Sequence, residues 1–457
     1  MLPAQPIGTT FSFSRATLAA YGARILFGVS LALVSYAIGV ATGEFRLPPH
    51  RLLGELWAAQ RDWQEHWRSN LGIEPTRHLG ESRHHAEDAV RHVDEQTSAG
   101  VTLLESLFDQ EVGLRLIDLE GNTIHTWPAR FSEIFPNPGI IDAEWGLPSN
   151  DWEVLIHGAS LYPDGDVLFN FSGLGLVRMD ACGDVEWKLP VAPHHSINIA
   201  DDGNIWTLGH RIYDQRTPDF PGLRPPFRDE LILEISPDGK LLRQSSVLKL
   251  LYDNDLAGVL FPIGIEALED EPMTDLLHAN DVEILSAKDA SAFALFEAGD
   301  ALVSMRNLNL LVVFDPDTGV VKWAQTGPWL RQHDPDFLPD GRILVFDNRS
   351  DHADGRLLAG SRLLAVDPVS RAVETVYEGT ESEPFFTDGR GKADLLTNGN
   401  FLLTETQFGR VFEVTPDGEI VWSFINRYDD DRIVHVNGAT RYPESYGRFD
   451  RSGCHVQ

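Results

Sequence analysis

The chain has 457 residues, ordinary apolar and charged fractions, and a formal net charge of −32 at pH 7. This length and composition predict a folded protein, either one large repeat domain or two ordinary domains, and exclude wholesale disorder. The acidic charge disfavours DNA and RNA as partners, because no basic stripe is present to contact phosphates. Cys182 and Cys454 are too few for a disulfide-dense scaffold, and the sequence leaves their pairing open.

The N-terminal region predicts a membrane anchor. Residues 1–24 carry basic but no acidic side chains, and residues 25–43 are almost entirely apolar. About 19 residues at ~1.5 Å rise nearly span a hydrocarbon core of ~30 Å. The charge distribution places residues 1–24 in the cytoplasm, so we expect a single-pass inner-membrane protein. A cleaved signal peptide is the alternative, although the apolar run exceeds the usual length for one.

Residues 44–99 are predicted to form a helical stalk next to the membrane, because Leu and Trp recur near helical spacing in its first half. His84, His85 and His92 lie in its polar second half and suggest a metal site. No matching Cys or carboxylate pattern accompanies them, so a solvated stalk is the favoured interpretation.

From about residue 100, short β-branched runs alternate with Asp-Gly and Pro-Asp-Gly turns. Two hairpin patterns alternate, an inner one such as YPDGDVLF (162–169) and an outer one ending in Trp, such as LVVFDPDTGVVKW (311–323). Sheets recurring every ~40–50 residues are typical of a β-propeller. We therefore predict an all-β, six-bladed β-propeller over residues 100–446, closed by pairing the inner segment 432–442 with the first outer hairpin, and a C-terminal tail at 447–457.

The histidines share a phase in this repeat. His157, His195 and His333 each lie eight residues before the turn glycine of an inner hairpin, and His278 and His435 open two others. Because the innermost strand of each blade lines the central channel, this phase predicts a ring of imidazoles at one mouth. Such a ring supplies nucleophiles and general acids. Nearby polar groups that extend the set are Asn280, Arg306, Asn307 and His194.

DLLHANDVE, LVSMRNLNLLVVFDPDTGVVKW, LRQHDPDFLPDGRILVFDN and ATRYPESY resemble the bacterial arylsulfotransferase family over residues 100–446. Family members are six-bladed periplasmic propellers that move a sulfuryl group from a phenolic sulfate ester to a phenol. They use a ping-pong route without a nucleotide donor. The resemblance therefore implies small-molecule aryl sulfates and phenols as partners and no cofactor or metal. Unlike the well-known members, this chain shows no N-terminal sandwich-like domain and no nearby cysteine pair.

The resemblance also implies roles for individual residues. His333 resembles the histidine that becomes sulfohistidine, and His278 with Asn280 resembles the pair that holds the sulfate and handles the phenol proton. Arg306 resembles the sulfate-binding arginine, and His195 or its neighbour His194 resembles the remaining site histidine. The substrate-binding group is expected to hold His194, His157, His435 and Asn307.

Two other classes of function stay open. The propeller could be catalytically idle and act as a periplasmic binding or assembly module. A metal- or quinone-dependent oxidoreductase is disfavoured, because the imidazoles in phase lack carboxylates. The sequence leaves homo-oligomerisation and the natural sulfate donor open.

Overall fold

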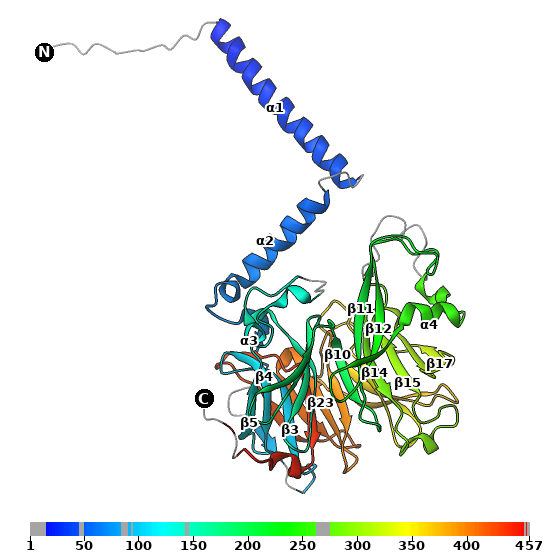
Figure 1. Cartoon of the computed structure of the whole chain (residues 1–457). Helices are drawn as coiled ribbons and strands as arrows, with labels where there is room; N and C mark the ends of the chain where they lie inside the picture. Colours follow the sequence, from blue (N-terminus) through cyan, green and yellow to red (C-terminus); the bar gives the residue numbers. More distant parts are fainter. Residues whose placement is uncertain are drawn as a thin grey trace, which may run out of the picture. The chain divides into compact units, whose positions relative to one another are not determined.

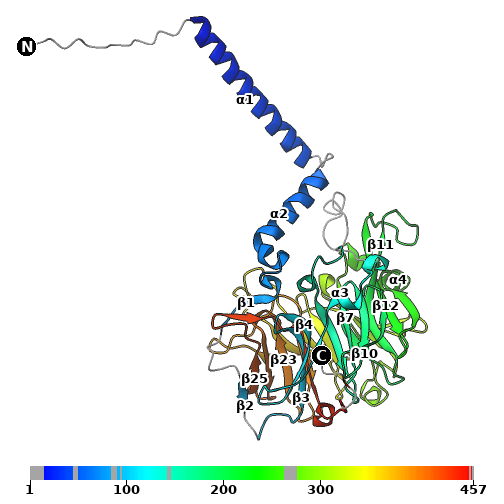
Figure 2. The same ribbon diagram turned by 60° about the vertical axis from the view of Figure 1, so that its left-hand side comes forward.

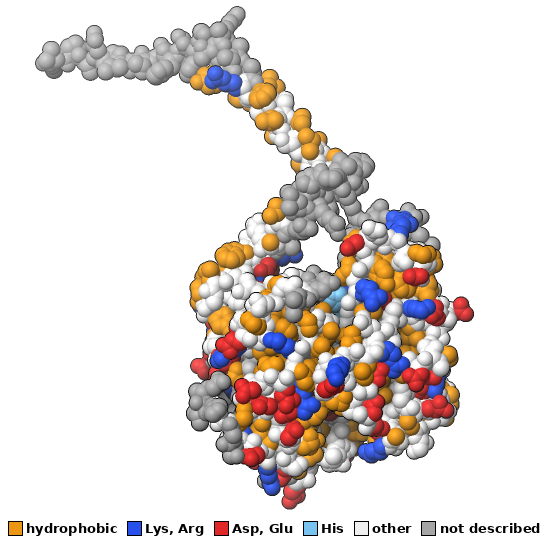
Figure 3. Space-filling model, viewed as in Figure 1, with side chains coloured by type: hydrophobic (Ala, Val, Ile, Leu, Met, Phe, Trp, Pro, Cys, Tyr) orange, Lys and Arg blue, Asp and Glu red, His pale blue; other side chains and the backbone are white. Residues whose placement is uncertain are grey.

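The computed structural model describes residues 15–44, 50–83, 90–92, 95–141, 146–261, 275–451 and 454. The chain divides into two compact units, Met1–Leu71 and Gly72–Gln457. The first holds α1 (Arg15–Glu44) and α2 (His50–Asn70). Within α1, the 19 residues Arg24–Thr42 have a mean hydropathy of 2.0 and are long and apolar enough to cross a membrane. Their apolar side chains follow the helix in Figure 3.

The predicted helical stalk over residues 44–99 is wrong in its second half. The helix ends at Asn70, and the short strands β1 (Leu79–Glu81) and β2 (Val90–His92) follow. β1 forms a two-stranded sheet with β26 (Arg432–Val434), and β2 pairs with β25 (Ile420–Ile425) at the edge of a larger sheet (Figure 2). This pairing supplies hydrogen-bond partners for the backbone N–H and C=O groups of β1 and β2. The polar sequence around them has no apolar face that would stabilise a helix. His84 and His85 lie outside the described residues.

The described part of the second unit is a six-bladed β-propeller, as predicted (Figure 1). Blade 1 joins the two ends of the propeller: β27 (Gly438–Tyr442), β3 (Val101–Phe108), β4 (Glu111–Ile117) and β5 (Thr123–Pro128). Blade 2 contains β6 (Ile156–Leu161), β7 (Val167–Phe171), β8 (Gly175–Met179) and β9 (Val185–Leu189). Blade 3 contains β10 (His194–Ile199), β11 (Ile205–Tyr213), β12 (Phe227–Ile235) and β13 (Leu241–Ser246).

The remaining blades follow in chain order. Blade 4 contains β14 (Ala279–Ile284), β15 (Ala301–Met305), β16 (Leu310–Phe314) and β17 (Val321–Thr326). Blade 5 contains β18 (His333–Phe337), β19 (Ile343–Asp347), β20 (Arg362–Val366) and β21 (Val373–Glu378). Blade 6 contains β22 (Lys392–Leu395), β23 (Phe401–Glu405), β24 (Arg410–Val414) and β25, with β2 outside.

Short helices lie in the connections. The α-helices are α3 (Phe131–Ile134) and α4 (Val247–Asp253). The 3₁₀ turns are η1 (Thr76–His78), η3 (Pro138–Ile140), η4 (Asp151–Glu153), η5 (Ala257–Leu260), η6 (Ala290–Ala292), η7 (Arg306–Leu308), η8 (Thr406–Phe408) and η9 (Glu444–Gly447).

The sequence patterns explain the blades. The turn glycine of an inner hairpin, such as Gly165 at φ +95°, adopts the left-handed conformation that other residues avoid. Two of the Trp side chains that end outer hairpins bond to the next blade. Trp187 donates its indole N–H to Pro237 O at 3.1 Å, and Trp422 donates to Leu119 O at 2.8 Å. These contacts fix blade 2 against blade 3 and blade 6 against blade 1.

Two features close the ring. β27 is the innermost strand of blade 1 and pairs antiparallel with β3, as the sequence predicted for the closing segment. Only Gly438–Tyr442 joins the blade, because Arg432–Val434 pairs with β1 instead. The tail then crosses to blade 2, where Cys454 forms a disulfide with Cys182 across a sequence separation of 272.

Candidate functional site

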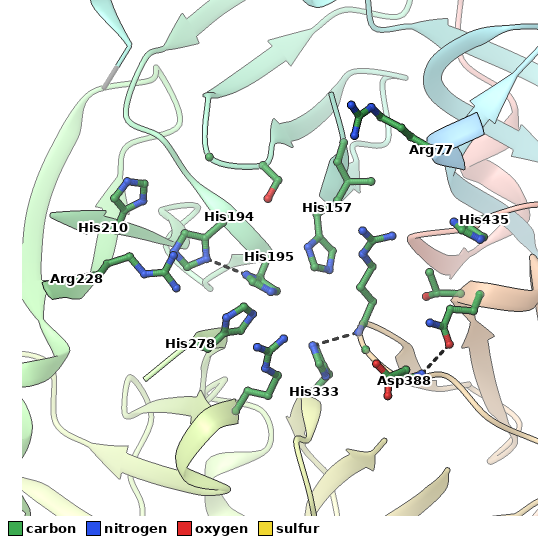
Figure 4. A pocket seen from close by; sticks show the side chains of 18 residues that line it. Arg77, His157, His194, His195, His210, Arg228, His278, His333, Asp388 and His435 are labelled. Carbon is green, nitrogen blue, oxygen red and sulfur yellow. Dashed lines mark hydrogen bonds between the residues drawn. The ribbon is translucent and has the colours of Figure 1, made fainter. Parts of the chain in front are cut away.

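The inner strands of the blades begin around one mouth of the central channel, and a cavity of about 460 Å³ opens there. Its lining gathers imidazoles and guanidinium groups from blades 2, 3 and 5 and from the connections between strands (Figure 4). The described lining residues are Arg77, Leu155, His157, Ser172, Gly173, His194, His195, His210, Arg228, His278, Arg306, His333, Asp388, Gly389, Arg390, Thr406, Gln407 and His435.

The imidazoles that share the repeat phase converge in this cavity. The ring of His195 lies 4.4 Å from that of His157, 5.2 Å from that of His278 and 6.2 Å from that of His333, between centroids. Figure 4 shows these side chains pointing toward a common centre. Burial lowers the pKa of His157 and of His195 well below the usual value, so both rings are neutral at pH 7.

Asp275 organises one side of the cavity. Its Oδ2 accepts a hydrogen bond from His278 Nδ1 at 2.6 Å, and its other oxygen pairs with Arg228. Arg306 NH2 lies 4.0 Å from the same carboxylate. Although burial alone would raise it, the hydrogen bond from His278 and the nearby charges lower the pKa of Asp275 to about 2. An ionised Asp275 accepts the Nδ1–H of His278 and leaves its Nε2 for a substrate.

Arg306 begins η7, directly after β15, and faces the cavity. Asn307 Oδ1 accepts from its Nε at 3.3 Å and NH2 at 3.2 Å, while Asn307 Nδ2 donates to Asp275 O at 2.7 Å. Asn307 does not line the cavity and orients the guanidinium instead. Burial lowers the pKa of Arg306 to about 10, so the side chain stays charged and favours an anion beside it.

His194 and His195 occupy different places although they are adjacent. His194 Nε2 bonds to the buried carboxylate of Glu230 at 3.0 Å, and its Nδ1 lies 2.8 Å from His195 Nδ1. Arg228 also pairs with Glu230, at 2.7 Å. His195 has a φ of +58°, which turns its ring into the channel beside His157. His194 therefore orients His195, and His195 is the ring at the centre.

His333 is held in one tautomer. Asn348 Nδ2 donates to Thr387 O and Arg390 O, so Asn348 Oδ1 faces His333 Nδ1 at 2.7 Å and accepts its proton. The Nε2 lone pair then accepts the backbone N–H of Arg390 at 3.1 Å. Burial, reinforced by the charge of Arg306, lowers the pKa of His333 to about 3. At neutral pH its Nε2 is an unprotonated nitrogen facing the cavity.

Below the cavity the channel narrows and becomes acidic. Asn280 lies there beside His157, His195 and His333, and its Nδ2 donates to Gln332 O at 2.7 Å. Its Oδ1 is buried without a hydrogen-bond partner among the described residues. The channel carboxyls are protonated more readily than usual, because burial raises the pKa of Glu105 to about 7 and that of Asp281 to about 8.

The structure thus brings together most residues selected from the sequence. His157, His194, His195, His278, Arg306, His333 and His435 line the cavity. Asn280 lies one layer deeper, and Asn307 lies behind Arg306. His435 is at the rim, between β26 and β27, where burial lowers its pKa to about 4.

Sequence reasoning missed the groups that hold these residues in place. They are Asp275, Arg228, Glu230, Asn348 and Arg390. The alternation Arg228-Asp229-Glu230 places two charged side chains on one face of β12, and that spacing was the available signal. Among the described residues, no group of three or more His, Cys, Asp or Glu is arranged to hold a metal ion.

A ring of imidazoles and arginines lies at the hub of the six-bladed propeller, and groups of these types can bind an anion and act as acids, bases or nucleophiles. The family model described as Arylsulfotransferase (ASST) matches residues 158–427. The chain belongs to the arylsulfotransferase family.

Other comparisons add little. A search of curated proteins finds no match. A solved protein of unknown function from Bacteroides caccae is 15% identical, with 75% of this chain and 98% of that chain covered and a TM-score of 0.45. Virginiamycin B lyase from Staphylococcus aureus is 12% identical, with 65% and 88% covered and a TM-score of 0.35. At these scores neither similarity bears on the function of this chain.

Proposed function

We propose that this protein is a membrane-anchored, periplasmic aryl-sulfate sulfotransferase that works by a ping-pong route through a sulfohistidine at His333. The observation that carries the proposal is the neutral, tautomer-fixed imidazole of His333 beside Arg306 in a cavity of the arylsulfotransferase fold. A neutral imidazole needs no prior ionisation to act as a nucleophile.

In the first half-reaction, His333 Nε2 forms a bond to sulfur while the bond from sulfur to the aryl oxygen breaks. The electron pair of the broken S–O bond stays on the aryl oxygen, which departs as a phenolate. The N–H of Arg390 occupies the attacking lone pair in the free protein, so this contact opens as the sulfuryl group enters. Arg306 binds the sulfuryl oxygens, on which negative charge is concentrated during transfer.

His278 acts as the general acid in the first half-reaction and as the general base in the second. Burial lowers its pKa, so it is a neutral base in the free protein. A bound sulfate ester brings negative charge into the cavity and raises that pKa, so His278 takes up a proton and gives it to the departing phenolate. In the second half-reaction, His278 accepts the proton of the acceptor phenol as its oxygen attacks sulfur and the bond from sulfur to His333 breaks.

Other residues support these steps. His195 and Asn280 lie against the cluster and hold the sulfuryl group from below, and His194 orients His195. His157, His435 and Asn307 complete the binding site, with Asn307 acting through Arg306. The disulfide between Cys182 and Cys454 and the apolar helix α1 support a periplasmic propeller tethered to the inner membrane.

Transfer from 4-nitrophenyl sulfate to phenol by the purified protein tests the proposal. We expect turnover that His333→Gln abolishes while the melting temperature stays close to that of the wild type. A protein that turns over no donor and acceptor pair, with an intact fold, supports the alternative of a catalytically idle binding module.

A further inference from the structure

The cavity carries more positive charge than a simple aryl sulfate needs. Its described lining includes the guanidinium groups of Arg77, Arg228, Arg306 and Arg390 but a single carboxylate, Asp388. Leu155 is the one aliphatic side chain among the same residues. An aryl sulfate monoester has one negative charge, which Arg306 neutralises. Arg228 pairs with Glu230 and Asp275, and Arg77 lies 3.9 Å from Glu153, so Arg390 is the guanidinium of this lining that is placed to meet a further anionic group on the ligand.

Two of these arginines face different sides of the imidazole cluster. The charge of Arg306 acts on His278 and His333 and lowers their pKa values. Arg390 lies on the connection before β22, and its charge instead acts on His157 and His435, lowering their pKa values after the effect of burial. Both guanidinium groups line the cavity, Arg306 beside Asp275 and Arg390 bonded to Asn437, and they therefore offer two separate anion contacts.

The half-buried Arg390 differs in its partners from arginines that pair with carboxylates elsewhere in the propeller. Arg228 pairs with Glu230 and Asp275, Arg410 with Glu383, and Arg441 with Glu413. Arg390 NH1 donates to Asn437 Oδ1 at 2.9 Å, and no carboxylate of the described residues lies within 4.0 Å of it. A half-buried cation without a counter-charge loses part of its hydration without compensation, and an anionic ligand reduces that cost.

We infer that the substrate carries a second anionic group, a carboxylate, phosphate or sulfate on its aryl portion, which binds Arg390 while the sulfuryl group lies between Arg306 and His333. This inference rests on the proposed function and names its substrate class. A cavity of about 460 Å³ lies within the range of ~300–1,000 Å³ that small-molecule sites occupy. A guanidinium fork matches the planar carboxylate and tetrahedral phosphate alike.

A binding experiment tests the second contact without turnover. 4-Sulfobenzoate and 4-carbamoylbenzenesulfonate have the same shape and a sulfonate that cannot be transferred, but only the first carries a carboxylate. By calorimetry, we expect the wild type to bind 4-sulfobenzoate at least tenfold more tightly, Arg390→Met to remove this preference, and Arg306→Met to weaken both ligands. Arg356→Met, at an exposed site, is the matched control and keeps the preference.

A turnover experiment separates this inference from the proposed function. With 4-nitrophenyl sulfate as donor, the ratio of kcat/KM for 4-hydroxybenzoate over 4-hydroxybenzamide is expected to be at least ten, and Arg390→Met to bring it close to one. Equal affinity for the two sulfonates and equal use of the two acceptors would overturn the second anion contact and leave sulfotransfer standing. Preferential binding of 4-sulfobenzoate with no turnover would contradict sulfotransfer and keep the anion contact.

Discussion

Replacing Arg306 by Met is the most informative single perturbation of the cavity. The side chain lies in the cavity beside His333, and Asn307 fixes its orientation. A unit charge ~4 Å from the transferring sulfuryl group at an effective dielectric of ~20 contributes about 4 kcal/mol. Loss of one preorganised donor typically costs about 3–4 kcal/mol. We therefore expect kcat/KM for 4-nitrophenyl sulfate to fall roughly a hundredfold to thousandfold.

The same change should not unfold the protein. Burial lowers the pKa of Arg306 to about 10, which means that the folded protein disfavours its charge, and its nearest described carboxylate is 4.0 Å away. Arg306→Met should leave the melting temperature unchanged or raise it. Arg306→Lys keeps a charge without the fork and should retain an intermediate rate.

Arg331→Met is the control, because Arg331 is a neighbour of Arg306 outside the cavity lining. We expect this variant to keep kcat/KM close to that of the wild type. Activity of Arg306→Met within threefold of the wild type would refute the assignment of Arg306 to the sulfuryl group.

Three further predictions follow from the described contacts. His278→Ala should slow phenyl sulfate, which has a poor leaving group, ~10²–10⁴-fold, and 4-nitrophenyl sulfate far less; equal losses would contradict its proton-transfer role. Glu105 has its pKa raised by burial to about 7, so its protonated form is favoured on folding and this contribution is lost as pH rises from about 4.5 through 7. Glu105→Gln should therefore stabilise the fold by about 3 kcal/mol at pH 8 and leave its stability unchanged at pH 4. Equal changes in melting temperature at the two pH values would contradict this role of Glu105. Cys454→Ser opens a disulfide that spans 272 residues and should cost about 2–5 kcal/mol, seen as a lower melting temperature that the reduced wild type matches.

The repeated turns made the fold predictable. Each turn glycine and each terminal Trp marks a local hairpin, so the six blades and the closure by β27 could be inferred from short-range pattern. The shared phase of His157, His195 and His333, and the position of His278 at the start of an inner hairpin, predicted that they would meet in one cavity, as they do. A repeated hairpin pattern can be recognised in a single sequence, and the arrangement of the blades follows from that pattern.

The supporting residues carry no such repetition. Asp275 reaches His278 from the connection before β14, and Asn348 reaches His333 from the end of β19. Their positions depend on how neighbouring strands pack, which a single sequence does not display. The strands β1 and β2 were missed for a related reason, since a three-residue segment becomes a strand only when a partner strand is present.

Intact-mass analysis after mixing with an aryl sulfate in the absence of an acceptor tests the central claim most directly. The account predicts that the protein gains the mass of one SO₃ group, that peptide mapping places it on His333, that His333→Gln gains none, and that phenol removes it. An adduct on another residue, or turnover in which no adduct forms at any time, would contradict the proposal that His333 is the sulfuryl carrier.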